Sequence, residues 1–200
     1  MNSIKVMKKN IVLFTILLSL TFVVHTAEAQ DGFFSNAKTL EKGTFAIGLQ
    51  PVVLTEQEDF LMILRGSYGL SRGLTSHFKV GALQEDVYIG GHLEYNLASE
   101  PNSSVSAAIL AGVYHQFETG LKFGFNLSRD FHPVSLYGGL NYQPTFINDD
   151  VTLNSLLLPI GLDYHIQNAP VDLMIEGNIP LNDDAEYLEA ISFGARIYLD

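Results

Sequence analysis

The sequence predicts an all-β protein, an antiparallel up-and-down transmembrane β-barrel of about ten strands, and three observations support this. Apolar residues alternate with small or polar residues at period two in almost every segment after Lys42. Most of these segments are about 10 to 13 residues long, whereas a strand of a soluble protein has ~5–6 residues and a tilted bilayer-spanning strand ~9–11. The apolar face is hydrophobic to both ends, and the opposite face is rich in Gly, Ser and Tyr.

The alternation defines ten candidate strands. They lie near residues 43–53, 60–70, 73–83, 86–97, 104–115, 118–128, 133–143, 153–166, 170–180 and 188–199. An even number of antiparallel strands places both chain ends on one side of the membrane. Barrels of 8 or 12 strands, and a periplasmic β-sandwich, are the alternatives, because a sandwich also alternates apolar and polar residues.

The last candidate strand shows why a closed barrel is expected. Phe193, Ala195 and Ile197 lie on one face, and Gly194 and Arg196 lie on the other. Hydrocarbon offers no partner to backbone N–H and C=O groups, so strands cross a bilayer only as a closed ring. The apolar face then contacts lipid, and the small and charged residues line the interior.

The N-terminus predicts export. Lys5, Lys8 and Lys9 precede an apolar run over 11–24, and a small-x-small pattern ends at Ala29. We therefore expect a cleaved signal peptide at 1–29, a periplasmic N-terminal lead-in at 30–42 and the barrel domain at 43–200. The lead-in either hangs free or folds back to close the inner mouth.

The composition excludes several classes of function. No cysteine is present, which removes disulfides, thiolate metal sites and a lipid-bearing cysteine. The formal net charge is −11, so the basic footprint of a nucleic-acid-binding protein is missing.

Four candidate strands end with the same aromatic-x-aliphatic step, and they are every second strand in the chain. The aromatic residues are Tyr68, Tyr95, Phe125 and Tyr164. Amphipathic rings favour the membrane–water interface, so these residues predict a periplasmic aromatic girdle. Connections at the opposite ends carry acids and no Lys or Arg; these acids are Glu56, Glu58, Asp59, Glu85, Asp86, Glu118, Asp149, Asp150, Asp183, Asp184 and Glu186. Carboxylates suit divalent cations, which are expected partners of this outer rim.

Parity directs a neutral set of charged residues into the barrel. The set is Arg65, Lys79, Glu94, Lys122, Asp163, Asp172, Glu176 and Arg196. Buried charges need partners, so this barrel-interior charged network is either a set of salt bridges that supports the wall or the lining of a polar conduit. His77 and His92 also point inward, but two assured ligands are fewer than a metal site needs. No metal or cofactor is predicted.

The C-terminal "SFGARIYL" resembles the insertion signal read by the barrel-assembly machinery, through Ser192, Gly194, Ile197 and Leu199. With this ending, the chain resembles the small outer-membrane β-barrel proteins of Gram-negative bacteria, of the OmpA, OmpX and OmpW sort, over residues 43–200. It departs from them in ending on Leu199 and Asp200 rather than on Phe. The resemblance implies an outer-membrane location, with outer-membrane lipids, lipopolysaccharide and the assembly machinery as partners.

Barrels of this kind host unrelated activities, so three functions are compared. The first is a structural or envelope-interaction role, with at most a narrow polar interior and no catalysis. The second is a porin-like channel for small solutes. The third is a lipid A-modifying enzyme, with His115 as its base and Glu118 nearby, although no spacing identifies a catalytic hydroxyl.

Overall fold

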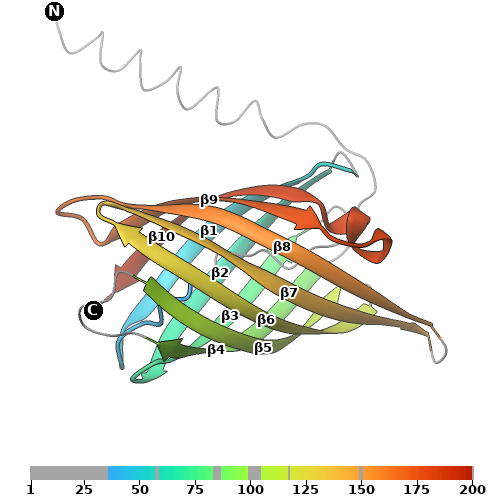
Figure 1. The fold of residues 1–200 in the computed structure, drawn as a ribbon, viewed down its shortest axis with the longest axis horizontal. Helices are drawn as coiled ribbons and strands as arrows, with labels where there is room; N and C mark the ends of the chain where they lie inside the picture. Colours follow the sequence, from blue (N-terminus) through green and yellow to red (C-terminus); the bar gives the residue numbers. More distant parts are fainter. Residues whose placement is uncertain are drawn as a thin grey trace, which may run out of the picture.

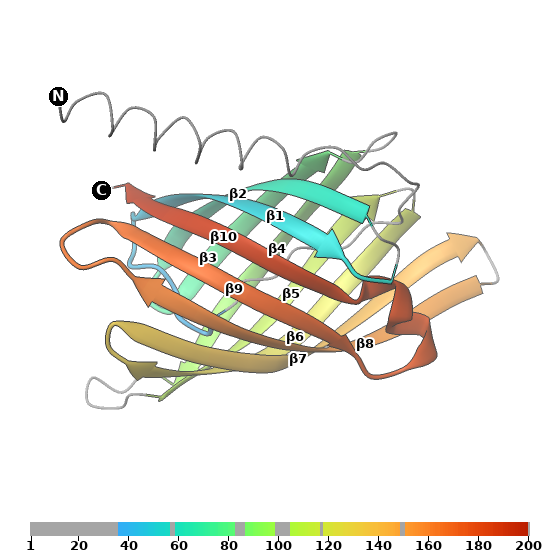
Figure 2. The ribbon, with the colours of Figure 1, turned by 90° about the horizontal axis from the view of Figure 1, so that it is seen from above.

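The computed structural model describes residues 36–56, 59–82, 87–98, 105–116, 118–148 and 151–199. The predicted signal peptide, residues 1–29, lies outside them, as does the start of the lead-in. The described strands form a closed barrel of ten, in which each strand pairs with its neighbours in sequence and β1 pairs with β10 (Figures 1 and 2). The predicted up-and-down barrel is therefore confirmed, and the sandwich and the 8- and 12-stranded alternatives are wrong.

All ten predicted strands are present, with small changes at their ends. They are β1 (Phe45–Leu54), β2 (Asp59–Ser71), β3 (Leu74–Ala82), β4 (Val87–Ala98), β5 (Val105–Gln116), β6 (Glu118–Phe131), β7 (Val134–Asn148), β8 (Val151–His165), β9 (Val171–Pro180) and β10 (Ala190–Leu199). The largest difference is β7, which was expected to end near residue 143. Proline cannot donate to a ladder and usually ends a strand. Here β7 continues through Pro144, which pairs with Asn154 in β8, and the β7–β8 hairpin reaches beyond the other strands (Figure 1).

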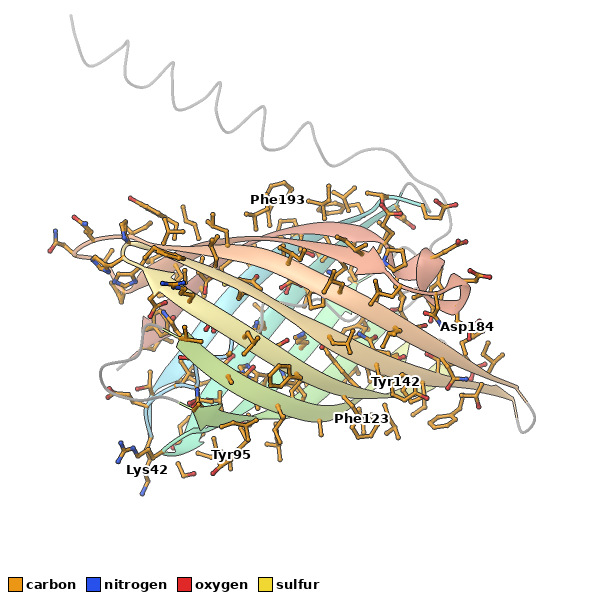
Figure 3. All side chains as sticks on the ribbon, viewed as in Figure 1. Lys42, Tyr95, Phe123, Tyr142, Asp184 and Phe193 are labelled. Atoms are coloured by element: carbon orange, nitrogen blue, oxygen red, sulfur yellow. The ribbon has the colours of Figure 1, made fainter. Side chains whose placement is uncertain are left out.

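The outer surface of the wall is apolar. Phe123, Tyr142 and Phe193 point away from the barrel in Figure 3, and each has 40% or more of its surface exposed. Similar exposure holds for aliphatic and aromatic residues on all ten strands. Soluble proteins rarely expose apolar patches larger than a few hundred Å². The exterior therefore suits hydrocarbon. Within the described residues, no helix has the length and hydrophobicity needed to span a bilayer.

Glycines allow large rings to fill the interior. Tyr137 pairs across the ladder with Gly161, and Tyr114 pairs with Gly120. A Cβ at Gly161 would lie 2.1 Å from Cζ of Tyr137, and one at Gly120 would lie 2.2 Å from Cζ of Tyr114. Each tyrosine ring thus occupies the space that a side chain at the opposite glycine position would fill.

The barrel has two mouths, which we name by the chain ends. The terminal mouth is the end where β1 begins and β10 finishes, and the far mouth is the opposite end. Residues 36–42, here called the stopper segment, cross the terminal mouth, where they are drawn in blue in Figures 1 and 2. The lead-in thus folds back, which was one of its two predicted conformations.

A short 3-10 helix, η1 (Asp183–Leu188), stands at the far mouth, where a solvated acidic loop was expected. Ala185 and Leu188 are three residues apart, which places them on one side of a 3-10 turn. Both are buried and pack on Leu157 of β8. The apolar side of the turn, hidden among four acidic residues in the sequence, holds this segment against the barrel.

Candidate functional site

The eight charged residues assigned to the interior are all buried, with exposures between 0% for Lys79 and 6% for Asp172. Arg196 forms ion pairs with Asp163 and Asp172. It lies at the same level of the wall as Arg65, since both pair with Gly48 of β1, and it acts electrostatically on Arg65 and Glu94. The other five residues are called the central group below; they are Arg65, Lys79, Glu94, Lys122 and Glu176.

His77 is held between charged side chains in the central group. Nη2 of Arg65 lies 2.8 Å from Nδ1 of His77, and the hydroxyl of Ser67 lies 2.8 Å from the same nitrogen. Because a guanidinium only donates, Nδ1 accepts, and the neutral ring carries its proton on Nε2. That nitrogen is 3.9 Å from Oε2 of Glu94. His77 therefore accepts a hydrogen bond from a buried cation and lies near a buried carboxylate without a hydrogen bond to it.

The central group also contains a candidate metal-ligand set that the sequence showed only in part. His77 and His92 are cross-strand partners with stacked rings, their centroids 4.5 Å apart. Together with Glu94 they offer three buried ligand atoms within 4.8 Å of one another. Two imidazoles and a carboxylate suit several transition metals. However, the Nε2 proton of His77 occupies a coordination direction, and the positive charges of Lys79 and Arg65 act on His92. We assign no metal to this set.

Two neutral side chains donate to Glu176, which also interacts electrostatically with Arg65. The hydroxyl of Tyr137 donates to Oε2 at 2.9 Å, and the amide of Asn178 donates to Oε1 at 3.3 Å. Tyr137 faces the interior by the parity of β7, but no pattern in the sequence indicates its hydrogen bond to a carboxylate. Cross-strand contacts between β7 and β9 cannot be read from the sequence of either strand, because β8 separates them.

At the terminal mouth, one arginine joins two aspartates. Nη2 of Arg196 lies 2.7 Å from Oδ2 of Asp172 and 3.5 Å from Oδ2 of Asp163. Asp172 also contacts Nδ1 of His165 at 2.8 Å and accepts a hydrogen bond from the hydroxyl of Tyr198. The sequence identified the three charged residues, but His165 and Tyr198 complete the cluster.

The stopper segment is held by polar contacts to five strands. The Asn36 amide donates to Asp163 of β8, and Lys38 contacts Asp130 of β6 and Ser135 of β7. Further bonds reach β3 and β4: the backbone N–H of Leu40 donates to Oγ1 of Thr75 at 2.7 Å, and Asn96 donates to the carbonyl of Ala37 at 2.8 Å. Gly43, just after the segment, bonds to Gly69 of β2. The segment thus closes much of the terminal mouth.

The interior between the mouths is filled. Lys79, Tyr88, Gln143, Ser155 and Leu157 have no exposed surface. Toward the far mouth an apolar cluster from β1, β2 and β10 occupies the lumen; its members are Val52, Leu54, Leu61, Ile63 and Ala190. The side chains that line this part of the lumen therefore have little or no surface exposed to solvent.

The four aromatic residues assigned to the girdle all face outward, each at least 41% exposed. Tyr95 lies toward the terminal mouth, where it pairs with Leu74 at the start of β3 (Figure 3). Phe125 is farther from its strand end than Tyr68, Tyr95 and Tyr164, because β6 continues to Phe131, whose ring is also exposed. The girdle at β6 thus extends over more residues than the sequence indicated.

The residues of the C-terminal insertion signal alternate in β10. Ser192 is fully buried, whereas Ile197 and Leu199 are more than 40% exposed. Gly194 pairs with Met174 of β9. This alternation is the one that the resemblance to outer-membrane barrels implies.

The acidic rim differs from expectation at two residues. Asp59 is buried, and its carboxylate accepts the backbone N–H of Phe60. Asp184 of η1 is used structurally, since its carboxylate accepts the backbone N–H of Asn154 at 2.9 Å (Figure 3 shows its position at the far mouth). Glu58, Glu85, Asp86, Asp149 and Asp150 lie outside the described residues.

His115, the candidate base of the enzyme hypothesis, is exposed on the outward side of β5. Its Nδ1 lies 3.1 Å from Oγ1 of Thr119 in β6. Glu118 pairs with Gln116 and is half-buried.

Comparison with known proteins identifies the fold. No protein-family model matches the chain, and no curated protein sequence matches it. Among solved structures, a KdgM porin matches with a TM-score of 0.54 and 12% identity, over 78% of this chain and 99% of the porin. The KdgM porin in complex with disordered oligogalacturonate matches with a TM-score of 0.51 and 10% identity, over 78% and 99%. At such low identity these matches show a shared fold, that of a small outer-membrane β-barrel, and no subfamily.

Proposed function

We propose that this protein is an integral outer-membrane β-barrel with a structural or envelope-interaction role and no continuous aqueous pore. The observation that carries the proposal is the filled lumen. The side chains halfway along the barrel are inaccessible to solvent, the stopper segment closes much of the terminal mouth, and η1 packs on Leu157 at the far mouth. A barrel of ~8 strands is just filled by side chains, and ten strands add modest space. Here Tyr88, Tyr114 and Tyr137 occupy that space.

The apolar exterior and the barrel fold support residence in a membrane. Export by a cleaved signal peptide and the insertion signal in β10 support the outer membrane of a Gram-negative cell. The terminal mouth then faces the periplasm, and η1 faces the cell exterior. Lipopolysaccharide, with the divalent cations that bridge it, is the proposed partner of the acidic far rim, and the assembly machinery is the partner during insertion.

Conductance across planar lipid bilayers tests the closed barrel. The purified, folded protein is expected to insert without producing unitary current steps, and a porin of known conductance added to the same membrane verifies detection. The folded state of the added protein is verified separately by a gel, on which the folded barrel migrates differently before and after boiling. Reproducible steps from the unmodified chain would contradict the filled lumen.

A small-solute channel is the second candidate, because the matching fold is that of a porin and the interior carries eight charges. This candidate requires the stopper segment and the central side chains to rearrange. It predicts current steps whose ion selectivity reverses in Arg65→Glu, since a charge lining the pore sets the selectivity. If the barrel is closed, this variant should produce no current steps, like the parent protein.

We propose no catalytic role. His115 lies on the exposed surface of β5, and the polar side chain that its Nδ1 contacts is Thr119 rather than an acid. Overproduction of the protein should leave the mass spectrum of lipid A unchanged. New or missing acyl chains that depend on His115 would favour the enzyme instead.

A structural role predicts an envelope phenotype. A strain lacking the protein should lose viability under chelator and detergent stress, and the parent protein should restore it. If the parent protein restores viability and also produces no current steps in planar bilayers, the envelope role is separated from transport.

A further inference from the structure

Among the described residues, the outward face of the barrel strands carries a single Lys or Arg side chain, that of Arg129 near the end of β6. Its cross-strand partners, Val105 and Leu136, are exposed apolar residues, so parity places the guanidinium on the lipid-facing side. A cation on this side of a barrel is destabilising at the bilayer midplane and is tolerated near the interfaces. The position of Arg129 along the barrel axis therefore matters.

The neighbouring wall shows that this position is interfacial. His115 of β5 pairs with Thr119 of β6 toward the far mouth, and Val105 pairs with Arg129 toward the terminal mouth. The outward residues between these two pairs are all apolar; they are Ala107, Ile109, Ala111 and Val113 of β5 and Leu121, Phe123, Phe125 and Leu127 of β6. Thr119 and Arg129 are ten residues apart, which at ~3.3 Å per residue and a tilt of ~40° spans about 25 Å along the barrel axis. The apolar band of an outer-membrane barrel is ~25 Å tall, so Arg129 lies at the level of the lipid headgroups.

The protein contacts the guanidinium of Arg129 but does not neutralise it. Its Cζ lies 5.0 Å from the centroid of the Phe131 ring, in a cation–π contact. Asp130, the adjacent acid in the chain, points to the other side of β6 and pairs with Lys38 of the stopper segment. Within the part of the chain that the structure describes, no carboxylate forms an ion pair with Arg129. The guanidinium, which has five N–H donors, is thus left with its full positive charge.

The exposed charges also differ between the two mouths. In the described structure every exposed Lys and Arg lies at the terminal mouth, where the exposed acid is Glu41; these cations are Lys42, Arg72 and Arg129. The exposed ionised side chains at the far mouth are acids, among them Glu56, Asp183 and Glu186. Electrostatic attraction therefore favours an anionic group at the terminal mouth over one at the far mouth.

We propose that Arg129 binds the phosphate of a phospholipid in the leaflet at the terminal mouth. A guanidinium can donate two parallel N–H bonds to a phosphate, which a lysine ammonium cannot do. The acyl chains of the same lipid lie against Leu127 and Phe125, the next outward residues of β6, both of which are exposed. This inference rests on the proposed membrane residence, and it adds a phospholipid partner on the side opposite the acidic far rim.

Native mass spectrometry of the full barrel in dodecyl maltoside, a detergent without phosphate, tests the proposal with three probes. These are dioleoyl phosphatidylglycerol, dioleoylglycerol, which has the same acyl chains without phosphate, and glycerol 3-phosphate, which has no acyl chains. Only phosphatidylglycerol is expected to give a retained one-to-one complex. Arg129→Gln should weaken that complex about tenfold or more, because hydrogen bonds between charged groups are lost. Arg72→Gln, which removes an exposed arginine from the β2–β3 turn at the same mouth, is the matched control and should bind like the parent.

Gel mobility before and after boiling verifies that both variants fold, as expected for substitutions of exposed side chains. The proposal is overturned if dioleoylglycerol or glycerol 3-phosphate is retained as well as phosphatidylglycerol, or if Arg129→Gln binds this lipid like the parent. It is also overturned if Arg72→Gln weakens binding as much as Arg129→Gln, because the lipid would then be attracted by the overall charge of the mouth. A barrel that stays dissolved without detergent would instead contradict membrane residence, so failure of the lipid site and failure of the proposed function can be told apart.

Discussion

Gly69 controls the docking of the stopper segment, and its replacement by alanine makes a quantitative prediction. An added Cβ would lie 1.9 Å from the carbonyl oxygen of Glu41 and 3.1 Å from that of Leu40. Both atoms belong to the backbone, so no rotamer change relieves the overlap. The segment must move away from β2, which breaks the bonds between Gly43 and Gly69 and between Gly69 and Thr44.

The cost follows from the contacts that are lost. Two backbone hydrogen bonds and the bond from Leu40 to Thr75 contribute roughly 1 kcal/mol each, so docking is weakened by about 2–3 kcal/mol. The population with an undocked segment then rises roughly 30- to 140-fold. Lys38, paired with Asp130 when docked, becomes accessible to trypsin together with Lys42, which already lies exposed.

Limited trypsin digestion followed by mass spectrometry measures this change. When undocking is fast relative to cleavage, the cleavage rate after Lys38 follows the undocked population. Gly69→Ala should therefore raise that rate by at least about tenfold. Gly66→Ala is the matched control on the same strand, since its Cβ would approach only the ring of Phe45, at 3.8 Å. Equal cleavage of Gly69→Ala and the parent, or acceleration by Gly66→Ala, would refute the reasoning.

Three further predictions concern stability, measured by urea unfolding in lipid or detergent. Gly161→Ala, whose Cβ would lie 2.1 Å from Tyr137, should destabilise by ~1–3 kcal/mol, and Gly177→Ala, with open space around it, should not. Leu93→Arg on the lipid-facing side should cost ~2–4 kcal/mol in a bilayer and much less in a loosely packed micelle. Arg196→Leu removes the arginine that pairs with two buried aspartates and should cost ~3–5 kcal/mol. A loss below about 1 kcal/mol for Gly161→Ala, for Leu93→Arg in a bilayer or for Arg196→Leu contradicts the mechanism given for that variant.

The sequence predicted the barrel because one physical constraint acts on every strand. A side chain faces lipid or lumen according to parity, and no strand can shift by one residue without exchanging its faces. Parity therefore placed Arg65 and Glu94 inside and Phe193 outside from sequence alone. The number of strands could also be predicted, because short connections separate the alternating segments along the chain.

The residues that the sequence did not predict are those whose position depends on contacts distant in sequence. Asn36 precedes Asp163 by 127 residues, and no local pattern indicates their contact. Asp59 looked like a rim acid because it follows Glu56, but its carboxylate binds the next backbone N–H and is buried. The expected strand stopped just before Pro144, but β7 continues, and Pro144 pairs with Asn154 of β8.

We expect the interior charges to support the wall as a network rather than as separate ion pairs, and this gives a final prediction. Arg65 and Lys79 are direct cross-strand partners, and like charges placed opposite each other are destabilising unless nearby anions compensate. Glu94 supplies that compensation from the next strand, where it contacts His77 and acts electrostatically on Arg65. Removing either charge alone therefore leaves an excess of the other sign inside a closed lumen.

A double-mutant cycle of Arg65→Gln and Glu94→Gln should then show coupling of about 0.5–3 kcal/mol, with the double variant more stable than the sum of the single losses predicts. Arg65→Gln combined with Asp59→Asn at the far mouth provides the comparison, and these two losses should add. Additivity in the first cycle would mean that Arg65 and Glu94 are each neutralised by other groups. Coupling would instead show that a polar set performs, inside a lipid-facing barrel, the packing role that apolar side chains have inside a soluble protein.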